Sequence, residues 1–354
     1  MSKQALLTSR DPRVTAVRPF RHSPSAIRHV FHFALCTLYF VLGVAAEAAA
    51  QAWKPQQPVE VIIGSAAGSS PDIMARAIQR IWQEKRLVEV PANVVNRVGG
   101  GNTIAWNFLS QRPGDGHFLM VSNINLSAGH LTGTTPWSFR DFTSLGILFH
   151  EYIAVSVAVD SPIRDGRDLL ARLKNDAGSV SLAVSSVAGG ANHIGAGLVF
   201  KSAGVDVRKV RTVVFDSAGK TMTAMLGGHV DVAASSITAA LNQVRNGKVR
   251  VLGVTAPRRL GGDMAPFPTW REVGAAADFS NYRGFIGAPN LSAAQVAYWE
   301  GVLARLDADG SWREYVDKNE LDRDLMNGRA ALQYLTELDG RLRAILGDLG
   351  LLKQ

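Results

Sequence analysis

The feature that most constrains the fold of this chain is an alternation of short apolar runs, loops of small residues and amphipathic segments. The alternation begins after residue 51, restarts near residue 180 and ends near residue 256. The apolar runs that read as strands are VEVII, HFLMVS, EYIAVSVAV, SVSLAV, VRTVVF, VDVAAS and VRVLGV. Strands that alternate with helices typically form parallel sheets covered by helices. Two successive series in 354 residues therefore predict two α/β domains with mainly parallel sheets.

The first repeat, VIIGSAAGSSPDIMARAIQRIW, raises the question of what its loop holds. Val59–Ile63 reads as a strand buried on both faces. Residues 64–70 have almost no side-chain bulk, so a ligand can approach their backbone closely. We expect a helix to begin at Ser70, with Ser70 as its cap and Pro71 in its first turn. Such a helix start favours an anion, although an ordinary turn between strand and helix has the same pattern.

The last third of the chain reads as helices without further repeats of the pattern. FIGAPNLS reads as a strand followed by a turn. Ser292-x-x-Gln295 is a capping box, which predicts a helix that runs to about Leu306. RAALQYLTELDGRLRAIL reads as a long amphipathic helix. Because no new strands are predicted for these helices to cover, we expect them to pack on the first domain.

This arrangement predicts that the chain crosses twice between its domains. The first domain would comprise residues 51–155 plus 284–354, and the second domain residues 156–283. Two crossings make a hinge, and a cleft between hinged domains is a natural ligand site.

Residues 1–50 have the pattern of a secretory signal peptide with a long basic leader. Phe31–Ala46 carries no charged side chain, and Ala48-Ala49-Ala50 offers a cleavage site before Gln51. The apolar run is shorter than the ~20 residues of a membrane-spanning helix; an uncleaved anchor is the alternative interpretation. The single cysteine, Cys36, lies in this segment, so we expect a mature chain without disulfides. These observations predict a periplasmic protein.

The formal net charge of +8 first points to an acidic partner, but its distribution does not. Part of the excess lies in residues 1–50, where arginine and lysine outnumber the acids. No dense stripe of basic residues follows, which excludes nucleic acid as the expected partner.

Motifs for catalysis, nucleotides and metals are incomplete in this sequence. Gly219-Lys220-Thr221 lacks the preceding glycine of a phosphate-binding loop, since that position is Val214. No Gly-x-Ser-x-Gly elbow and no metal-ligand spacing occur. A serine nucleophile at Ser185 or Ser186 beside His193 remains an alternative, but a turn-capping serine is the more usual role. We therefore predict no cofactor, no metal and no enzymatic activity.

Small polar loops follow most of the predicted strands. They span residues 65–72, 98–103, 122–125, 185–192, 216–220 and 235–236. In an open α/β sheet, ligands bind beyond the carboxyl ends of the strands. Several of these loops lead into predicted helix starts, so their amides would converge on one cleft. Such a site would hold a carboxylate by hydrogen bonds.

At the level of the whole chain, residues 54–352 resemble the periplasmic receptors of tripartite tricarboxylate transporters, also called Bug receptors. The segments that carry the resemblance are VIIGSAAGSSPDIMAR, NRVGGGNTIAWNFLSQRPGDG, AVSSVAGGANHIGAGLVFKSAGVDVRKVRTVVF, LGGHVDVAASS, GKVRVLGVTAPRR, FPTWREVG and NYRGFIGAP. The resemblance implies a two-domain periplasmic-binding-protein architecture, type II-like, that closes like a flytrap on a carboxylated solute. It also implies that backbone amides, hydroxyls and bridging waters hold that solute.

Carried over position by position, the resemblance implies a set of ligand-binding residues. These residues are Ser65, Gly68, Ser69, Ser70, Asp72, Ser122, Asn123, Ser185, Ser186, Gly189, His193, Phe215, Asp216 and Ser235. The chain departs from the family where Ala67-Gly68-Ser69-Ser70 replaces a common Pro-Gly-Gly-Gly, and where Phe215-Asp216-Ser217 replaces Tyr-Lys-Gly. Asp216, together with Tyr282-Arg283-Gly284, looks more like the tricarboxylate-binding branch.

The resemblance implies a non-catalytic, exported receptor. It would capture a di- or tricarboxylate-like organic acid in an interdomain cleft and deliver it to the permease subunits of the transporter in the membrane. We expect it to act as a monomer. Two alternatives stay open at this point: a ligand-sensing receptor for a two-component sensor kinase, and a hydrolase.

Overall fold

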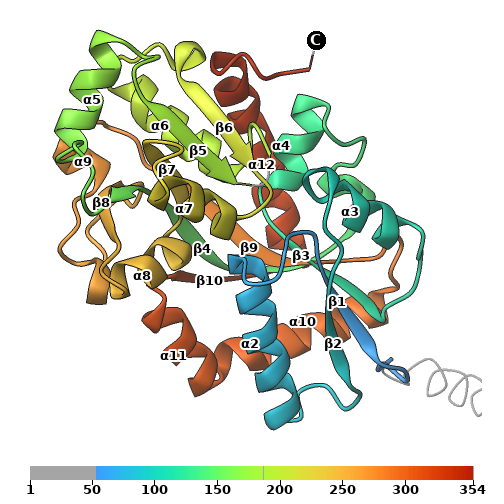
Figure 1. Cartoon of the computed structure of the whole chain (residues 1–354). Coiled ribbons are helices and arrows are strands. Elements are labelled where there is room, and N and C mark those ends of the chain that lie inside the picture. The colour runs from blue at the N-terminus through green and yellow to red at the C-terminus, as the bar shows by residue number, and fades with distance from the viewer. Residues whose placement is uncertain (1–52, 186, 354) are drawn as a thin grey trace, which may run out of the picture. The chain divides into compact units, whose positions relative to one another are not determined.

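The computed structural model describes residues 53–185 and 187–353 (Figure 1). The predicted signal peptide and cleavage site lie outside these residues, as does Ser186. The strands are β1 (Val59–Ile63), β2 (Ala92–Asn96), β3 (Phe118–Ser122), β4 (Thr143–Ala158), β5 (Ser181–Ser185), β6 (Arg211–Phe215), β7 (Val232–Ser236), β8 (Val249–Val254), β9 (Ser280–Gly287) and β10 (Asp322–Asn327). The α-helices are α2 (Ser70–Glu84), α3 (Thr103–Ser110), α4 (Asn125–Thr132), α5 (Gly166–Asn175), α6 (Ala191–Ser202), α7 (Ala218–Leu226), α8 (Ile237–Arg245), α9 (Trp270–Val273), α10 (Ala293–Ala308), α11 (Gly310–Lys318) and α12 (Gly328–Asp348). Short 3₁₀ turns lie at Gly100–Asn102, Phe139–Asp141, Val207–Lys209 and Gly262–Met264.

The predicted alternation of strands and helices is confirmed. The first repeat forms β1 and then α2, which begins at Ser70 as expected. In α2 the residues Met74, Ile78 and Ile81 are at most 3% exposed. Each such side chain stabilises the fold by about 1.5–3 kcal/mol when it leaves water. The apolar face of α2 thus anchors the helix, and with it the loop that precedes the helix.

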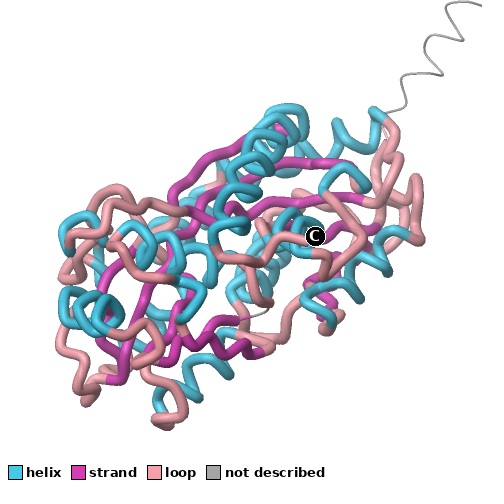
Figure 2. The backbone as a smooth tube through the Cα atoms, turned by 90° about the horizontal axis from the view of Figure 1, so that it is seen from above, coloured by secondary structure: helices cyan, strands magenta, loops and turns pink. Residues whose placement is uncertain are grey.

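The long strand β4 connects two lobes. The strand order is β2-β1-β3-β9-β4-β7-β5-β6, with β8 and β10 also paired to β4. The first part of β4 pairs with β9 and β10, and from Ile153 onward it pairs with β7 and β8. We call the strands β1, β2, β3, β9 and β10 with the helices around them the first lobe, and β5–β8 with theirs the second lobe. Figure 2 shows the strands gathered in these two groups, with helices around each. The domain boundaries themselves stay a prediction.

Strand directions are more mixed than the sequence predicted. The pairs β1–β2, β1–β3, β5–β6 and β5–β7 are parallel. The pairs that involve β4 or β9 are antiparallel. The apolar pattern shows that a strand exists but not its direction. Because β4 leaves the first lobe and β9 returns to it, the two strands run in opposite directions.

The C-terminal third also differs from the expectation. It contributes one further strand, β10, whose sequence DRDLMN has little apolar pattern because the strand is half exposed. Helix α12 lies against β4 and α4, and its C-terminal end also lies against α6 of the second lobe. Leu349 fills the space beside Gly197, and Asp348 pairs with Lys201. The helices were expected to pack on the first domain, and the end of α12 contacts the second lobe as well.

Among the described residues, the search for a helix both long and apolar enough to span a bilayer finds none.

Candidate ligand-binding site

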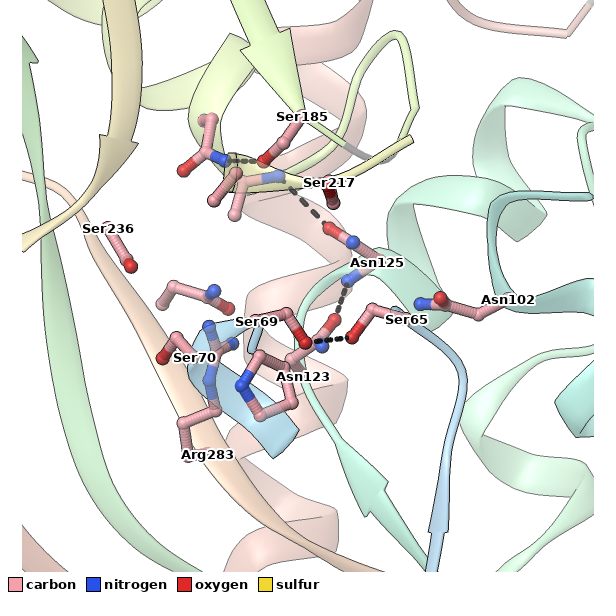
Figure 3. Close-up of a pocket in the computed structure, with 15 residues that line it drawn as sticks. Ser65, Ser69, Ser70, Asn102, Asn123, Asn125, Ser185, Ser217, Ser236 and Arg283 are labelled. Atoms are coloured by element: carbon pink, nitrogen blue, oxygen red, sulfur yellow. Dashed lines mark hydrogen bonds between the residues drawn. The ribbon is translucent and has the colours of Figure 1, made fainter. Parts of the chain in front are cut away.

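Both lobes contribute to one polar pocket, which encloses a cavity of about 50 Å³. Most of its lining residues are serines and asparagines, so hydroxyls and amides face the cavity. The lining residues are Ser65, Ser69, Ser70, Pro71, Asn102, Asn123, Asn125, Ser185, Ala191, Asn192, Ser217, Ala218, Ser236, Asn281 and Arg283. Figure 3 shows Ser185 and Ser217 on one side, Ser69, Ser70 and Arg283 on the other, and Asn125 between them. Since one water needs about 10–15 Å³ by this measure, the lobes approach each other closely in this conformation.

Six helix N-termini meet at this pocket. The lining includes the first residues or the N-caps of α2, α3, α4, α6, α7 and α8, each of at least eight residues. Each N-terminus carries a partial charge of roughly +0.5 and several unpaired backbone N–H groups. Ser217 and Ser236 cap α7 and α8 with their side chains, whereas the N-caps of α2 and α6 make no side-chain cap. The arrangement favours an anion from several directions at once.

The carboxylate of Asp72 holds the loop before α2 in place by hydrogen bonds. It accepts hydrogen bonds from the Gly68 N–H at 2.9 Å, from Asn96 Nδ2 at 3.0 Å and from Arg76 Nε at 3.1 Å. Burial raises the pKa of Asp72, but these hydrogen bonds outweigh burial and hold its pKa below the usual value. Gly68 has a φ of +78°, a conformation that favours glycine. The turn is therefore fixed before any ligand arrives.

The two serines at the start of α2 do not act as the sequence predicted. Ser69, not Ser70, is the N-cap residue, and its hydroxyl lies 2.7 Å from the Ser65 hydroxyl. The Ser70 hydroxyl instead donates to the carboxylate of Glu151, with oxygen–oxygen distances of 3.0 and 3.1 Å. The expectation that Ser70 caps the helix was wrong, because Ser70 is already the first helical residue and the residue before it, Ser69, takes the N-cap position.

Glu151 and Arg283 form a buried ion pair, of which Arg283 lines the pocket and Glu151 lies outside the lining. Arg283 Nη2 donates to Glu151 Oε2 at 2.8 Å. The side chains of Arg283 and Glu151 are 5% and 0% exposed. Arg283 Nε and Nη1 are buried, and within residues 53–185 and 187–353 neither has a hydrogen-bond partner. Arg283 is the one charged side chain among the described residues that line the pocket.

The predicted site residues divide into two groups. Five of them line the pocket: Ser65, Ser69, Ser70, Asn123 and Ser185. The other described ones, which lie outside its lining, are Gly68, Asp72, Ser122, Gly189, His193, Phe215, Asp216 and Ser235. Ser186 lies outside the described residues. Whether any of the fourteen contacts a ligand stays a prediction.

Most of the residues outside the lining have structural partners nearby. Ser122 Oγ lies 3.1 Å from the Tyr282 hydroxyl, and buried Ser235 Oγ donates to the Ser236 carbonyl at 3.2 Å. Asp216 is exposed and pairs with Lys220 at 2.5 Å. It borders a second hollow, which Gly64 and residues 98–102 also line.

His193 and Ser185 do not bond to each other. His193 Nδ1 accepts from the Gly189 N–H at 3.0 Å, and burial lowers the pKa of His193. Ser185 Oγ accepts from Asn192 Nδ2 at 2.5 Å. A serine nucleophile needs a base within hydrogen-bond reach. Here Ser185 bonds to Asn192 and His193 bonds to Gly189, so the two do not form a nucleophile and its base. In the part of the chain that the structure describes, no group of three His, Cys, Asp or Glu side chains is arranged to hold a metal ion.

Sequence reasoning missed several lining residues. Five polar ones stand in the loops that were identified but were not singled out: Asn102, Asn125, Asn192, Ser217 and Ser236. Asn281 and Arg283 lie within β9, where no polar loop was predicted. Arg283 was noted only within the segment Tyr282-Arg283-Gly284, although an arginine inside an otherwise buried strand is unusual and would have marked it as a site residue.

Comparisons with known proteins agree with this architecture. A family model described as "Tripartite tricarboxylate transporter family receptor" matches residues 74–351. Protein BugT from Bordetella pertussis is 25% identical over 260 residues, which cover 70% of this chain and 72% of BugT.

Two solved structures share the fold. The periplasmic binding protein BugD superposes with a TM-score of 0.76 at 21% identity, over 85% of this chain and 100% of BugD. A protein from R. palustris, Rpa4515, which was solved with adipate, superposes with a TM-score of 0.77 at 18% identity, over 84% of this chain and 98% of Rpa4515. The fold is thus the two-domain α/β fold of periplasmic binding proteins. Since the family model covers most of the chain, the protein belongs to the family of tripartite tricarboxylate transporter receptors.

Proposed function

We propose that this protein captures a small organic acid in the pocket between its lobes and delivers it to the membrane subunits of a tripartite tricarboxylate transporter. The observation that carries the proposal is the convergence of six helix N-termini on one polar pocket. Within the described residues no aspartate or glutamate lines this pocket. The electrostatic potential in the pocket therefore favours a negatively charged ligand.

A di- or tricarboxylate fits the distribution of donors. The start of α2 and Arg283 lie in the first lobe, and the starts of α6, α7 and α8 lie in the second. A ligand with a carboxylate at each end would contact both sets and draw the lobes together. The relative that was solved with adipate holds an acid of this kind.

The signal-peptide pattern of residues 1–50 supports a periplasmic location, where a receptor of this family would meet its solute. N-terminal sequencing of the protein from its host should begin near Gln51. Recovery of the protein from the cytoplasm, or with residues 1–30 retained in the periplasm, would contradict export by a cleaved peptide.

Capture is tested by thermal unfolding of the mature protein with C3–C6 mono-, di- and tricarboxylic acids. A ligand at 100 times its Kd adds about 2.7 kcal/mol to the free energy of unfolding. Such a gain raises the Tm by roughly 4–5 °C for a chain of this size. The matched amides serve as controls for nonspecific effects. If no acid raises the Tm of a cooperatively folded protein, the proposed capture is wrong.

Delivery is tested separately in the host. Uptake of the labelled acid that binds should fall when the gene for this protein is deleted, and should return when the gene is restored. If uptake is unchanged while binding is tight, a sensory role is the better explanation and the transport part of the proposal is wrong.

A further inference from the structure

We propose that Arg283 binds one ligand carboxylate directly and that buried Glu151 holds Arg283 in position for this contact. The inference rests on the proposed function and deepens it, because it assigns one end of the acid to one side chain. It also requires that the ligand carry at least one free carboxylate.

The first step of the argument is the position of Arg283. Arg283 lies in β9, opposite Phe149 of β4, close to the point where β4 changes its partners from one lobe to the other. In Figure 3 its side chain rises from the strand toward Ser69 and Ser70. A ligand that reaches Arg283 is therefore also within reach of the α2 N-terminus.

The second step counts the donors of the guanidinium group. Arginine has five N–H groups and no acceptor. The bond to Glu151 uses one N–H of Nη2, and within the described residues Nε and Nη1 have no partner. Whichever N–H of Nη2 serves Glu151, the other one forms a complete two-donor edge with a neighbouring nitrogen. A carboxylate matches such an edge with two parallel hydrogen bonds.

The third step is the cost of leaving those donors unpaired. A buried charged group without its hydrogen bonds is destabilising. The side chain of Arg283 is 95% buried in a pocket that two lobes close. A ligand carboxylate would satisfy the guanidinium where the protein does not.

The fourth step assigns Glu151 and Ser70 a positioning role. Glu151 is fully buried and receives both the Arg283 Nη2 donor and the Ser70 hydroxyl. These bonds restrict the rotamers of Arg283 before the ligand binds, which lowers the entropic cost of binding. Since the single hydroxyl proton of Ser70 is directed at Glu151, Ser70 does not donate to the ligand. Its backbone N–H and that of Asp72 remain as donors at the helix start.

The test is a thermodynamic cycle in which the Arg283 side chain and one ligand carboxylate are each removed alone and then together. Succinate, glutarate and adipate are each compared with their monoamide and diamide by calorimetry. The wild-type protein should bind the best monoamide about 10–150-fold more tightly than the matching diamide, which corresponds to a charged hydrogen bond of 1.5–3 kcal/mol. In the double variant Glu151→Gln/Arg283→Gln this ratio should fall below about threefold. A purely structural role would weaken both ligands equally and leave the ratio unchanged.

Two further variants keep the test decisive. Glu151→Gln alone keeps the arginine and an acceptor for it, so the monoamide should bind at least as tightly as to the wild type. Arg283→Lys keeps the charge but lacks the two-donor edge, so the ratio should drop about tenfold even if the double variant does not fold.

The outcomes separate the two proposals. If wild-type protein binds diamides as tightly as monoamides, or if the double variant keeps the wild-type ratio, Arg283 is not the anchor and capture of acids still stands. If Glu151→Gln weakens binding of the monoamide and of the diamide by the same factor, the pair is structural and the inference is wrong. If none of the nine ligands binds, the acid that raises the Tm most in the screen of C3–C6 acids is compared with its own amides instead; if no acid raises the Tm, the proposed function fails together with this inference.

Discussion

Replacing Asp72 by asparagine is expected to loosen the loop that shapes one wall of the pocket. Asp72 Oδ2 faces the Gly68 N–H and Oδ1 faces Asn96 Nδ2, so both oxygens face donors. An asparagine must turn its NH₂ group toward one of these donors in either orientation. Arg76 would also lose its ionic partner, but its side chain is half exposed and this part of the effect is screened.

The expected cost follows from these contacts. A buried hydrogen bond to a charged group contributes about 1.5–3 kcal/mol, and an unsatisfied donor adds its desolvation penalty. Because these hydrogen bonds are partly buried, with one of the two donors left facing an NH₂ group we expect Asp72→Asn to lower the free energy of unfolding by about 1–3 kcal/mol.

Urea unfolding, followed by circular dichroism and by tryptophan fluorescence, measures this loss. The matched control is Asp216→Asn, because Asp216 is exposed and its ion pair with Lys220 lies at the surface. We expect a change below about 0.5 kcal/mol for the control. A loss below 0.5 kcal/mol for Asp72→Asn as well would refute the assignment of Asp72 as the support of the loop.

The same carboxylate predicts a dependence on pH. In the folded state the pKa of Asp72 lies below its ordinary value of 3.8. Its contribution to stability is therefore present above about pH 3.8 and is lost as the pH falls through the lowered pKa. The difference in unfolding free energy between wild type and Asp72→Asn should shrink over that acidic range.

Gly284→Ala should prevent stable folding, because a Cβ there would overlap the Gly146 carbonyl oxygen of the neighbouring strand; a soluble variant that unfolds cooperatively would contradict this. Ser292→Ala should lower the free energy of unfolding by about 1 kcal/mol, since Ser292 caps α10, and an unchanged urea midpoint would count against the cap. Burial lowers the pKa of His193 from 6.5, so stability should decline as the pH falls below about 6.5, and His193→Asn should flatten that decline. Small-angle scattering should give a smaller radius of gyration with a saturating acid than without it; no change would argue against closure of the hinge.

The local elements of this fold follow from local sequence. Val59–Ile63 and the helix at Ser70 were predictable because an apolar run, small residues and a proline act within a few positions of one another. The capping box at Ser292 likewise predicted α10. Such signals depend on the chain's immediate neighbours, so no knowledge of the tertiary structure was needed.

Features set by distant partners were not predictable in the same way. The strand β10 exists because it pairs with β4, and its own residues show little pattern. The role of Ser70 depends on Glu151, which is 81 residues away. Arg283 lies in the pocket because β9 runs beside β4, a pairing that no local motif encodes. These parts of the site require the topology before they can be recognised.

The place of β9 in the sheet also has a consequence for the order of folding. β9 lies between β3 and β4, although it begins at Ser280 and β3 ends at Ser122. The strands β5–β8, by contrast, lie together between residues 181 and 254. Contacts between sequence-distant residues form slowly, because a long loop must close first. During synthesis the strands β5–β8 can therefore pair soon after each of them is made, whereas β3 waits for its neighbour β9 while the whole second lobe is made between them.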